Sequence, residues 1–165
     1  MKITYGIEGT QIDITDVAKS KCMKSSIIYI PPDDNVRARL FTDPIFRTVK
    51  SIFVNGQSYG PDTPIFFDTE SMMVYTTTLP DHIAEVYPEH AVIGKLLSLQ
   101  SKLTLLHGSL RDEFPEQKMA VRFLRPEDRV LEIGGNVGRN SLIIASIVGQ
   151  NSLVVLESDP DIAKQ

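Results

Sequence analysis

The sequence has one cysteine, no tryptophan and no long apolar run. Because Cys22 has no partner within the chain, no internal disulfide can form, and a reducing compartment is favoured. The opening residues lack the apolar stretch of a signal peptide, and the apolar stretches elsewhere are too short to span a bilayer. We therefore expect a cytoplasmic protein that has no membrane as a partner.

Basic residues are also few. Lys and Arg number 17 against 21 Asp and Glu, which gives a formal net charge of -4. Broad, charge-driven binding to nucleic acid needs a basic surface, so we expect no nucleic acid partner. Hydrophobic residues make up 42% of the chain and charged residues 23%, which suits a packed globular core. A length of 165 residues allows one ordinary domain or two small ones.

The first eighty residues are predicted to be rich in strands. Short apolar or alternating segments separated by turn residues lie at 3–5, 11–17, 26–30, 48–54, 64–67 and 72–77. Asn55-Gly56 favours a tight hairpin turn because both residues tolerate a positive φ. Strands at this spacing predict that residues 1–80 form a small antiparallel sheet or sandwich.

The pattern becomes helical after Pro80. Apolar residues at three- and four-residue spacing predict an amphipathic helix over 89–107, with Pro88 in its first turn and Gly108 at its exit. A second helix is predicted over 115–124, since the residue before Pro126 resists the helical region. These helices open the second part of the chain, residues 81–165, and the boundary is expected near 79–87.

A glycine-rich turn then separates two buried segments. Residues 129–133 predict a strand, 134–138 the turn, 140–148 an apolar helix and 152–156 a second strand. A strand, a crossover helix and a strand of these lengths predict parallel pairing with a right-handed connection. The N–H groups at the start of the helix would favour the negative end of a ligand.

The residues in and around this turn have the chemistry of a cofactor site. Glycines at Gly134, Gly135 and Gly138 remove Cβ atoms where the backbone must bend and approach a ligand. Glu132, at the end of the first strand, could receive a cation or fix the loop. Glu157 ends the second strand at the same edge of the sheet, where a carboxylate can accept both hydroxyls of a ribose.

These residues resemble motif I of S-adenosylmethionine-dependent methyltransferases, in which an acidic residue precedes three glycines at alternate positions. Here Glu132, Gly134 and Gly138 keep the pattern, and Asn136 takes the place of the middle glycine. With Arg-Asn-Ser at 139–141 and Leu-Glu-Ser-Asp-Pro at 156–160, residues 115–165 are similar to the FkbM family. The candidate cofactor-binding residues are Glu132, Gly134, Gly135, Asn136, Gly138, Glu157 and Ser158.

The resemblance implies a fold, a cofactor and a reaction. The expected fold is α+β overall: a small antiparallel β-rich module, a helical linker, and the first β-α-β unit of a Rossmann-like α/β domain. The expected cofactor is S-adenosylmethionine, and the expected reaction is methylation of an oxygen atom on a sugar or another small-molecule or glycan acceptor. Such a domain has about seven strands, so the chain is expected to be an N-terminal portion of a methyltransferase.

An incomplete parallel sheet has physical consequences. Two strands and one helix leave an open sheet edge and an uncovered apolar face, through which a homo-oligomer could form. We expect weak or no cofactor affinity and no turnover from residues 1–165 alone, and no catalytic residue is assigned. The alternative function is that the β-rich module binds a carbohydrate or a protein, without catalysis.

Other kinds of site fit the sequence less well. A dinucleotide site needs glycines at i, i+2 and i+5, but counting from Gly134 gives Asn136 and Arg139, so that fingerprint fails. The acidic pair Asp33-Asp34 lacks the alternation of a calcium loop and is predicted to be a turn-forming loop. The histidines have no metal-binding spacing, and no metal is expected. They are His82, His90 and His107.

Overall fold

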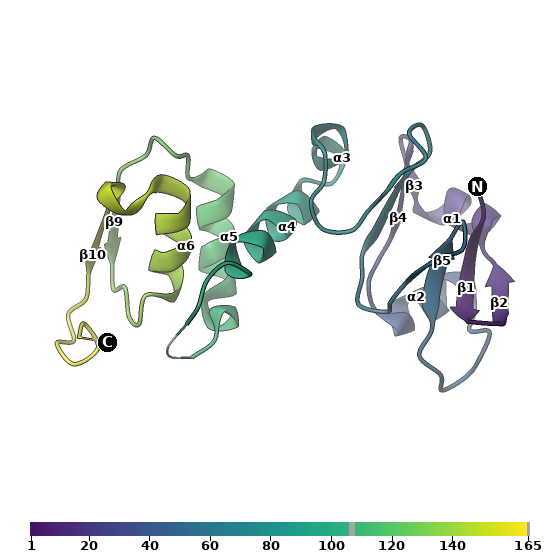
Figure 1. The fold of residues 1–165 in the computed structure, drawn as a ribbon, viewed down its shortest axis with the longest axis horizontal. Helices are drawn as coiled ribbons and strands as arrows, with labels where there is room; N and C mark the ends of the chain where they lie inside the picture. The colour runs from purple at the N-terminus through teal and green to yellow at the C-terminus, as the bar shows by residue number, and fades with distance from the viewer. Residues whose placement is uncertain (106–107, 165) are drawn as a thin grey trace. The chain divides into compact units, whose positions relative to one another are not determined.

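The computed structural model describes residues 1–105 and 108–164 as two compact units, unit 1 (Met1–Val86) and unit 2 (Tyr87–Gln165). The fold is mixed α+β, with antiparallel sheets and, within the described residues, six α-helices (Figure 1). None of the helices in that part of the chain has the length and apolar character needed to cross a membrane. The predicted boundary after residue 80 lies just before α3 (Asp81–Val86), which belongs to unit 1.

Unit 1 contains two four-stranded sheets, and every strand pair in them is antiparallel. The first sheet has the order β2-β1-β5-β6, formed by β1 (Ile3–Ile7), β2 (Thr10–Asp13), β5 (Ser51–Val54) and β6 (Gln57–Tyr59). The second has the order β3-β4-β7-β8, formed by β3 (Met23–Lys24), β4 (Ile27–Ile30), β7 (Ile65–Asp68) and β8 (Val74–Tyr75). The antiparallel, β-rich character predicted for this part of the chain is confirmed.

Alternate residues of both sheets share one core. The strand residues in it are Ile3, Tyr5, Ile28, Ile30, Ile52, Val54, Ile65 and Phe67. Successive side chains of a strand point to opposite faces, so β1, β4, β5 and β7 each contribute one row to this core. Complete burial of an aliphatic or phenylalanine side chain stabilises by about 1.5–3 kcal/mol. The predicted hairpin turn joins β5 to β6, with φ of 50° at Asn55 and 90° at Gly56.

The strand predicted over 11–17 is only half correct. Strand β2 ends at Asp13, and helix α1 (Thr15–Cys22) follows it. The Asp13 carboxylate accepts a hydrogen bond from the Thr15 N–H at 2.9 Å, which favours the turn out of the strand. Ile14 and Ala18 are buried four residues apart, the spacing of one face of a helix. Because a short strand is followed directly by a short helix, the apolar residues fit the two-residue spacing of a strand as well as the four-residue spacing of a helix. The prediction followed the two-residue spacing and extended the strand too far.

The loop predicted at Asp33-Asp34 is the start of a helix, α2 (Asp34–Phe41). The Asp33 side chain caps it by accepting the Asn35 N–H at 2.8 Å. The buried residues of α2 are Arg37 and Phe41. Because one of the two inward residues is charged, the sequence lacks the apolar spacing by which a helix is recognised, and the prediction is wrong here.

The described residues of unit 2 form three α-helices and a pair of strands. The elements are α4 (Pro88–Gln100), the 3-10 helix η1 (Leu110–Glu113), α5 (Phe114–Phe123), β9 (Val130–Ile133), α6 (Arg139–Val148), the 3-10 helix η2 (Gln150–Ser152) and β10 (Leu153–Leu156). The helix predicted over 89–107 ends at Gln100 and a turn follows, while Leu106 and His107 lie outside the described residues. The core joins the three helices through Leu96, Ala120, Val121, Ile143, Ile144 and Val148.

The strands β9 and β10 pair in parallel, from Val130 with Leu153 to Ile133 with Leu156. Helix α6 connects them and covers one face, where Val130 and Leu153 pack against the core of unit 2 (Figure 1). The opposite face presents four large apolar side chains that are 52–79% exposed. They are Leu131, Ile133, Val154 and Leu156.

Candidate functional site

The segment from Gly134 to Gly138, called here the glycine loop, connects β9 to α6. Gly134, Asn136 and Gly138 have φ of 79°, 49° and 81°, a left-handed conformation that glycine and asparagine adopt most easily. The N–H groups of Gly134 and Gly135 donate to the Leu156 carbonyl at 2.7 and 3.2 Å. The loop is therefore fastened to the carboxyl end of β10 as well as to its own strand, β9.

Two glycines of the loop have opposite surroundings. A Cβ atom on Gly135 would overlap Cγ1 of Val155, because the loop backbone passes directly over β10. A Cβ atom on Gly134 would meet nothing within 4 Å. Gly135 is thus needed for packing, whereas the backbone at Gly134 borders open space that a ligand could approach.

Glu157 follows β10 and reaches back to the glycine loop. Its Oε2 accepts the Asn136 N–H at 2.7 Å, and its Oε1 accepts the Asp159 N–H at 2.8 Å. These donors, Asp159 first and then Asn136, hold the pKa of the Glu157 carboxyl below its usual value. Ser158 is exposed, with its Oγ 3.5 Å from Glu157 Oε1. The structure therefore brings Glu157, Ser158 and the loop together at one edge of the sheet.

Acidification is expected to release this contact at a pH below the ordinary range of glutamate. The pKa of Glu157 is lower in the folded chain than in the unfolded one, so its stabilisation is present at neutral pH. That stabilisation is lost as the pH falls through the lowered pKa. Carbon-13 NMR of the Glu157 carboxyl should titrate together with the amide shifts of Asn136 and Asp159. A carboxyl that titrates in the ordinary range would show that the contact is absent.

Glu132 points from β9 toward the first turn of α6. Its Oε1 accepts Asn140 Nδ2 at 2.8 Å, and its Oε2 accepts the Ser141 hydroxyl at 2.5 Å. The carboxylate therefore fixes the end of β9 to the beginning of α6 across the glycine loop. Of the two roles considered for Glu132, fixing the loop is the one these hydrogen bonds perform.

A third carboxylate, that of Glu113, lies at the amino end of α6. Its Oε2 accepts the Asn140 N–H at 3.1 Å, and its Oε1 is 3.1 Å from Arg139 Nη1. The prediction that the N–H groups there await a ligand is therefore wrong at Asn140. Sequence analysis missed this role of Glu113, because no local pattern links residues separated by a helix, a strand and a loop.

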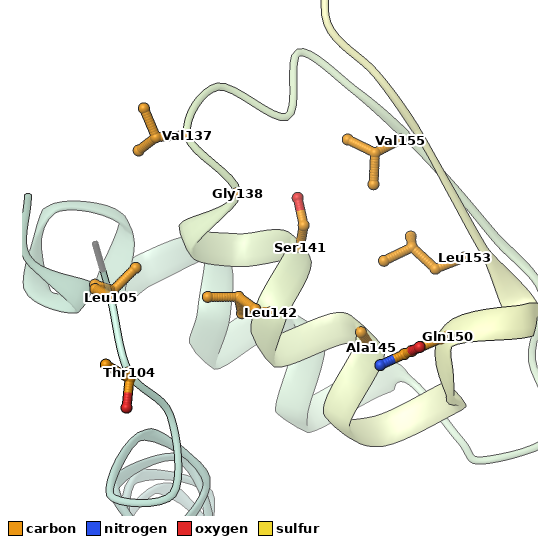
Figure 2. A pocket seen from close by; sticks show the side chains of 10 residues that line it. All are labelled: Thr104, Leu105, Val137, Gly138, Ser141, Leu142, Ala145, Gln150, Leu153 and Val155. Carbon is orange, nitrogen blue, oxygen red and sulfur yellow. The ribbon is translucent and has the colours of Figure 1, made fainter. Parts of the chain in front are cut away.

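A hollow of about 450 Å³ lies beside the loop, between α6 and β10. Figure 2 shows Leu153 and Val155 pointing from β10 toward it, with Val137 and Gly138 near one end. Most of its walls are apolar, and none of the described residues that line it is charged. It therefore suits an uncharged group better than a phosphate or an ammonium.

A separate hollow of about 380 Å³ lies in unit 1. There the buried carboxylate of Asp68 accepts the Ser71 hydroxyl at 2.7 Å and the Glu70 N–H at 2.9 Å, and lies 3.2 Å from His82 Nε2. These contacts, led by Ser71, keep the pKa of Asp68 below its usual value. Among the described residues, no cluster of three or more His, Cys, Asp or Glu side chains is arranged to hold a metal. The hydrogen bonds explain the Asp68 cluster as a link between β7 and α3.

The chain was also compared with known proteins. No protein-family model matches it, and neither a curated protein nor a solved structure matches it. The geometry and charge of the glycine loop and of the residues around it are therefore the observations that bear on function.

Proposed function

We propose that the glycine loop and Glu157 form the S-adenosylmethionine site of a Rossmann-like methyltransferase that methylates an oxygen on a sugar or another small acceptor. One observation carries the proposal: Glu157, after one strand of a parallel pair, bonds to the glycine loop after the other strand. In open parallel sheets, ligands bind at the carboxyl ends of the strands, where such loops and acidic residues meet.

The chemistry of Glu157 fits a ribose. Its lowered pKa keeps it ionised at neutral pH, and each carboxylate oxygen can accept a bond beyond the one it receives from the backbone. The two hydroxyls of a ribose are donors at the spacing of a carboxylate. Beside it, the open space at Gly134 lets a ligand lie against the backbone.

The charge around the loop supports a cationic ligand. The carboxylates of Glu113, Glu132 and Glu157 lie within hydrogen-bonding distance of the loop or of the first turn of α6, and Arg139 pairs with one of them. A phosphate would enter a field of like charge, whereas a sulfonium and an ammonium would be attracted. This favours S-adenosylmethionine over a dinucleotide, in agreement with the failed glycine spacing.

The contribution of these residues would be binding and orientation. When bound, the cofactor supplies an electrophilic methyl group on its sulfonium. The glycine loop and Glu157 would fix the direction of that group relative to an acceptor oxygen, and holding two reactants in line lowers the barrier by removing the entropy of their encounter.

Replacing Glu157 by alanine is expected to weaken S-adenosylmethionine binding at least tenfold, equivalent to about 1.4 kcal/mol. The variant loses the acceptor for the ribose and the contact to the Asn136 N–H. Because the affinity of residues 1–165 is expected to be weak, an NMR titration that follows the amides of the loop is the suitable measurement. Glu127→Ala, which removes an exposed carboxylate between α5 and β9, is the matched control. Equal affinity in the two variants would remove Glu157 from the site.

A further inference from the structure

The carboxylate of Glu113 occupies the place at the amino end of α6 where an anionic ligand would bind. Backbone N–H groups and the dipole make the start of a helix attractive to anions. In α6 the Asn140 N–H already donates to Glu113 Oε2 at 3.1 Å, and the adjacent Arg139 guanidinium is paired with Glu113 Oε1. We propose that Glu113 is a specificity-determining residue, which excludes phosphate-bearing ligands from the glycine loop and leaves the loop selective for a cationic cofactor. The selectivity for a cationic cofactor rests on the proposed function, whereas the exclusion of phosphate does not.

The position of Glu113 is built into the segment before α5. Ser109 and Asp112 cap the start of η1: the Ser109 hydroxyl oxygen accepts the Arg111 N–H at 3.2 Å, and the Asp112 carboxylate accepts the Ser109 N–H at 3.2 Å. Gln117 is fully buried, donates to the Leu110 carbonyl at 2.9 Å and accepts Gln100 Nε2 at 2.6 Å. The beginning of η1 is thereby bonded to α5 and, through Gln117, to α4, and Glu113 at its other end is held beside α6.

The contacts around Arg139 strengthen the same arrangement. Its side chain is 16% exposed and that of Glu113 is 22% exposed, so the pair is largely removed from water. Arg139 Nε also lies 3.6 Å from Asp112 Oδ2. Gly108 packs so closely on the guanidinium that a Cβ atom there would overlap it. A cation that could otherwise attract a phosphate to the loop is therefore neutralised and covered.

The charge that remains is negative. Arg139 offsets one carboxylate, while Glu132 and Glu157 accept bonds from neutral N–H and O–H donors, which add no positive charge. A ligand group entering between them meets uncompensated negative charge, and the helix end that would normally counter it is already occupied. Cationic ligands are therefore favoured on electrostatic grounds. Anionic ligands are disfavoured both by the negative charge and by the occupied helix end.

The test uses inorganic phosphate as the probe, with the amides of Asn140 and Ser141 followed by NMR in residues 1–165. We expect phosphate to leave them unmoved in the wild-type chain and to shift them saturably in Glu113→Ala, with at least a tenfold gain in affinity. Glu113→Gln should show a smaller gain, because its amide oxygen can still accept the Asn140 N–H. Glu116→Ala, which removes an exposed carboxylate from the first turn of α5, should behave as wild type.

Each outcome decides the matter. Equal phosphate shifts in wild type and Glu113→Ala, or none in either Glu113 variant, would overturn the proposal. If Glu113→Ala does not fold, the Gln variant still decides, because it preserves the size of the side chain. A parallel titration with S-adenosylmethionine separates the two proposals. If Glu113→Ala gains phosphate binding but the loop does not respond to the cofactor, the role of Glu113 is supported and the proposed function is contradicted.

Discussion

Gly135→Ala is expected to displace the glycine loop, to lower the free energy of unfolding of unit 2 by about 1–3 kcal/mol, and to weaken S-adenosylmethionine binding more than tenfold. The added Cβ atom would overlap Cγ1 of Val155, a branched side chain whose χ1 is restricted. The loop must therefore rise from the strand, and the N–H bonds of Gly134 and Gly135 to the Leu156 carbonyl must lengthen.

A second substitution provides the control. Val155→Ala removes the Cγ1 atom that the new Cβ would strike, so the double variant Gly135→Ala/Val155→Ala should recover most of the lost stability and affinity. Urea unfolding and cofactor titration of the four chains form a double-mutant cycle. Simple addition of the two single effects would mean that the overlap is not the cause.

Arg37→Met is expected to lower the free energy of unfolding of unit 1 by about 3–5 kcal/mol. The Arg37 side chain is fully buried, and it donates to the carbonyls of Pro31 at 2.8 Å, Gly60 at 2.8 Å and Thr63 at 2.6 Å. Methionine fills much of the same volume but cannot donate to these part-buried carbonyls, of which that of Gly60 keeps a bond from the Thr63 N–H at 3.3 Å. The loss should therefore come from unsatisfied hydrogen bonds and not from a cavity.

Tyrosine fluorescence during urea unfolding can measure this effect. The chain has no tryptophan, and Tyr87 is the single tyrosine of the sequence in unit 2, so the signal comes mainly from unit 1. Arg39→Met alters an exposed arginine of the same helix and should change the free energy by less than about 0.5 kcal/mol. Similar losses in the two variants would show that the bonds of Arg37 to the backbone do not stabilise the unit.

The sequence was most informative where local chemistry and local structure coincide. Asn55-Gly56 requires a positive φ and forms the predicted hairpin, and the helix predicted over 115–124 is α5 within one residue at each end. The apolar segments around the glycine loop predicted the parallel strands and α6 for the same reason. In each case, neighbours in the chain determine the conformation.

Prediction failed where residues distant in the sequence determine the conformation or the contact. Helix α2 buries Arg37, and only the carbonyls of two other segments make that burial stable. Glu113 reaches Asn140 because Gln117 and the capping box hold η1 in place, and no spacing in the sequence indicates such a contact. The residues of the loop could be named from the sequence, but the bonds that hold them could not.

The central claim is that the glycine loop and Glu157 bind S-adenosylmethionine, and a nitrogen-15 NMR titration of residues 1–165 tests it most directly. We expect weak, saturable shifts confined to the amides of 134–138 and 157–159, and no such shifts with NAD at the same concentrations. Shifts that map elsewhere, or an equal response of the loop to NAD, would contradict the account.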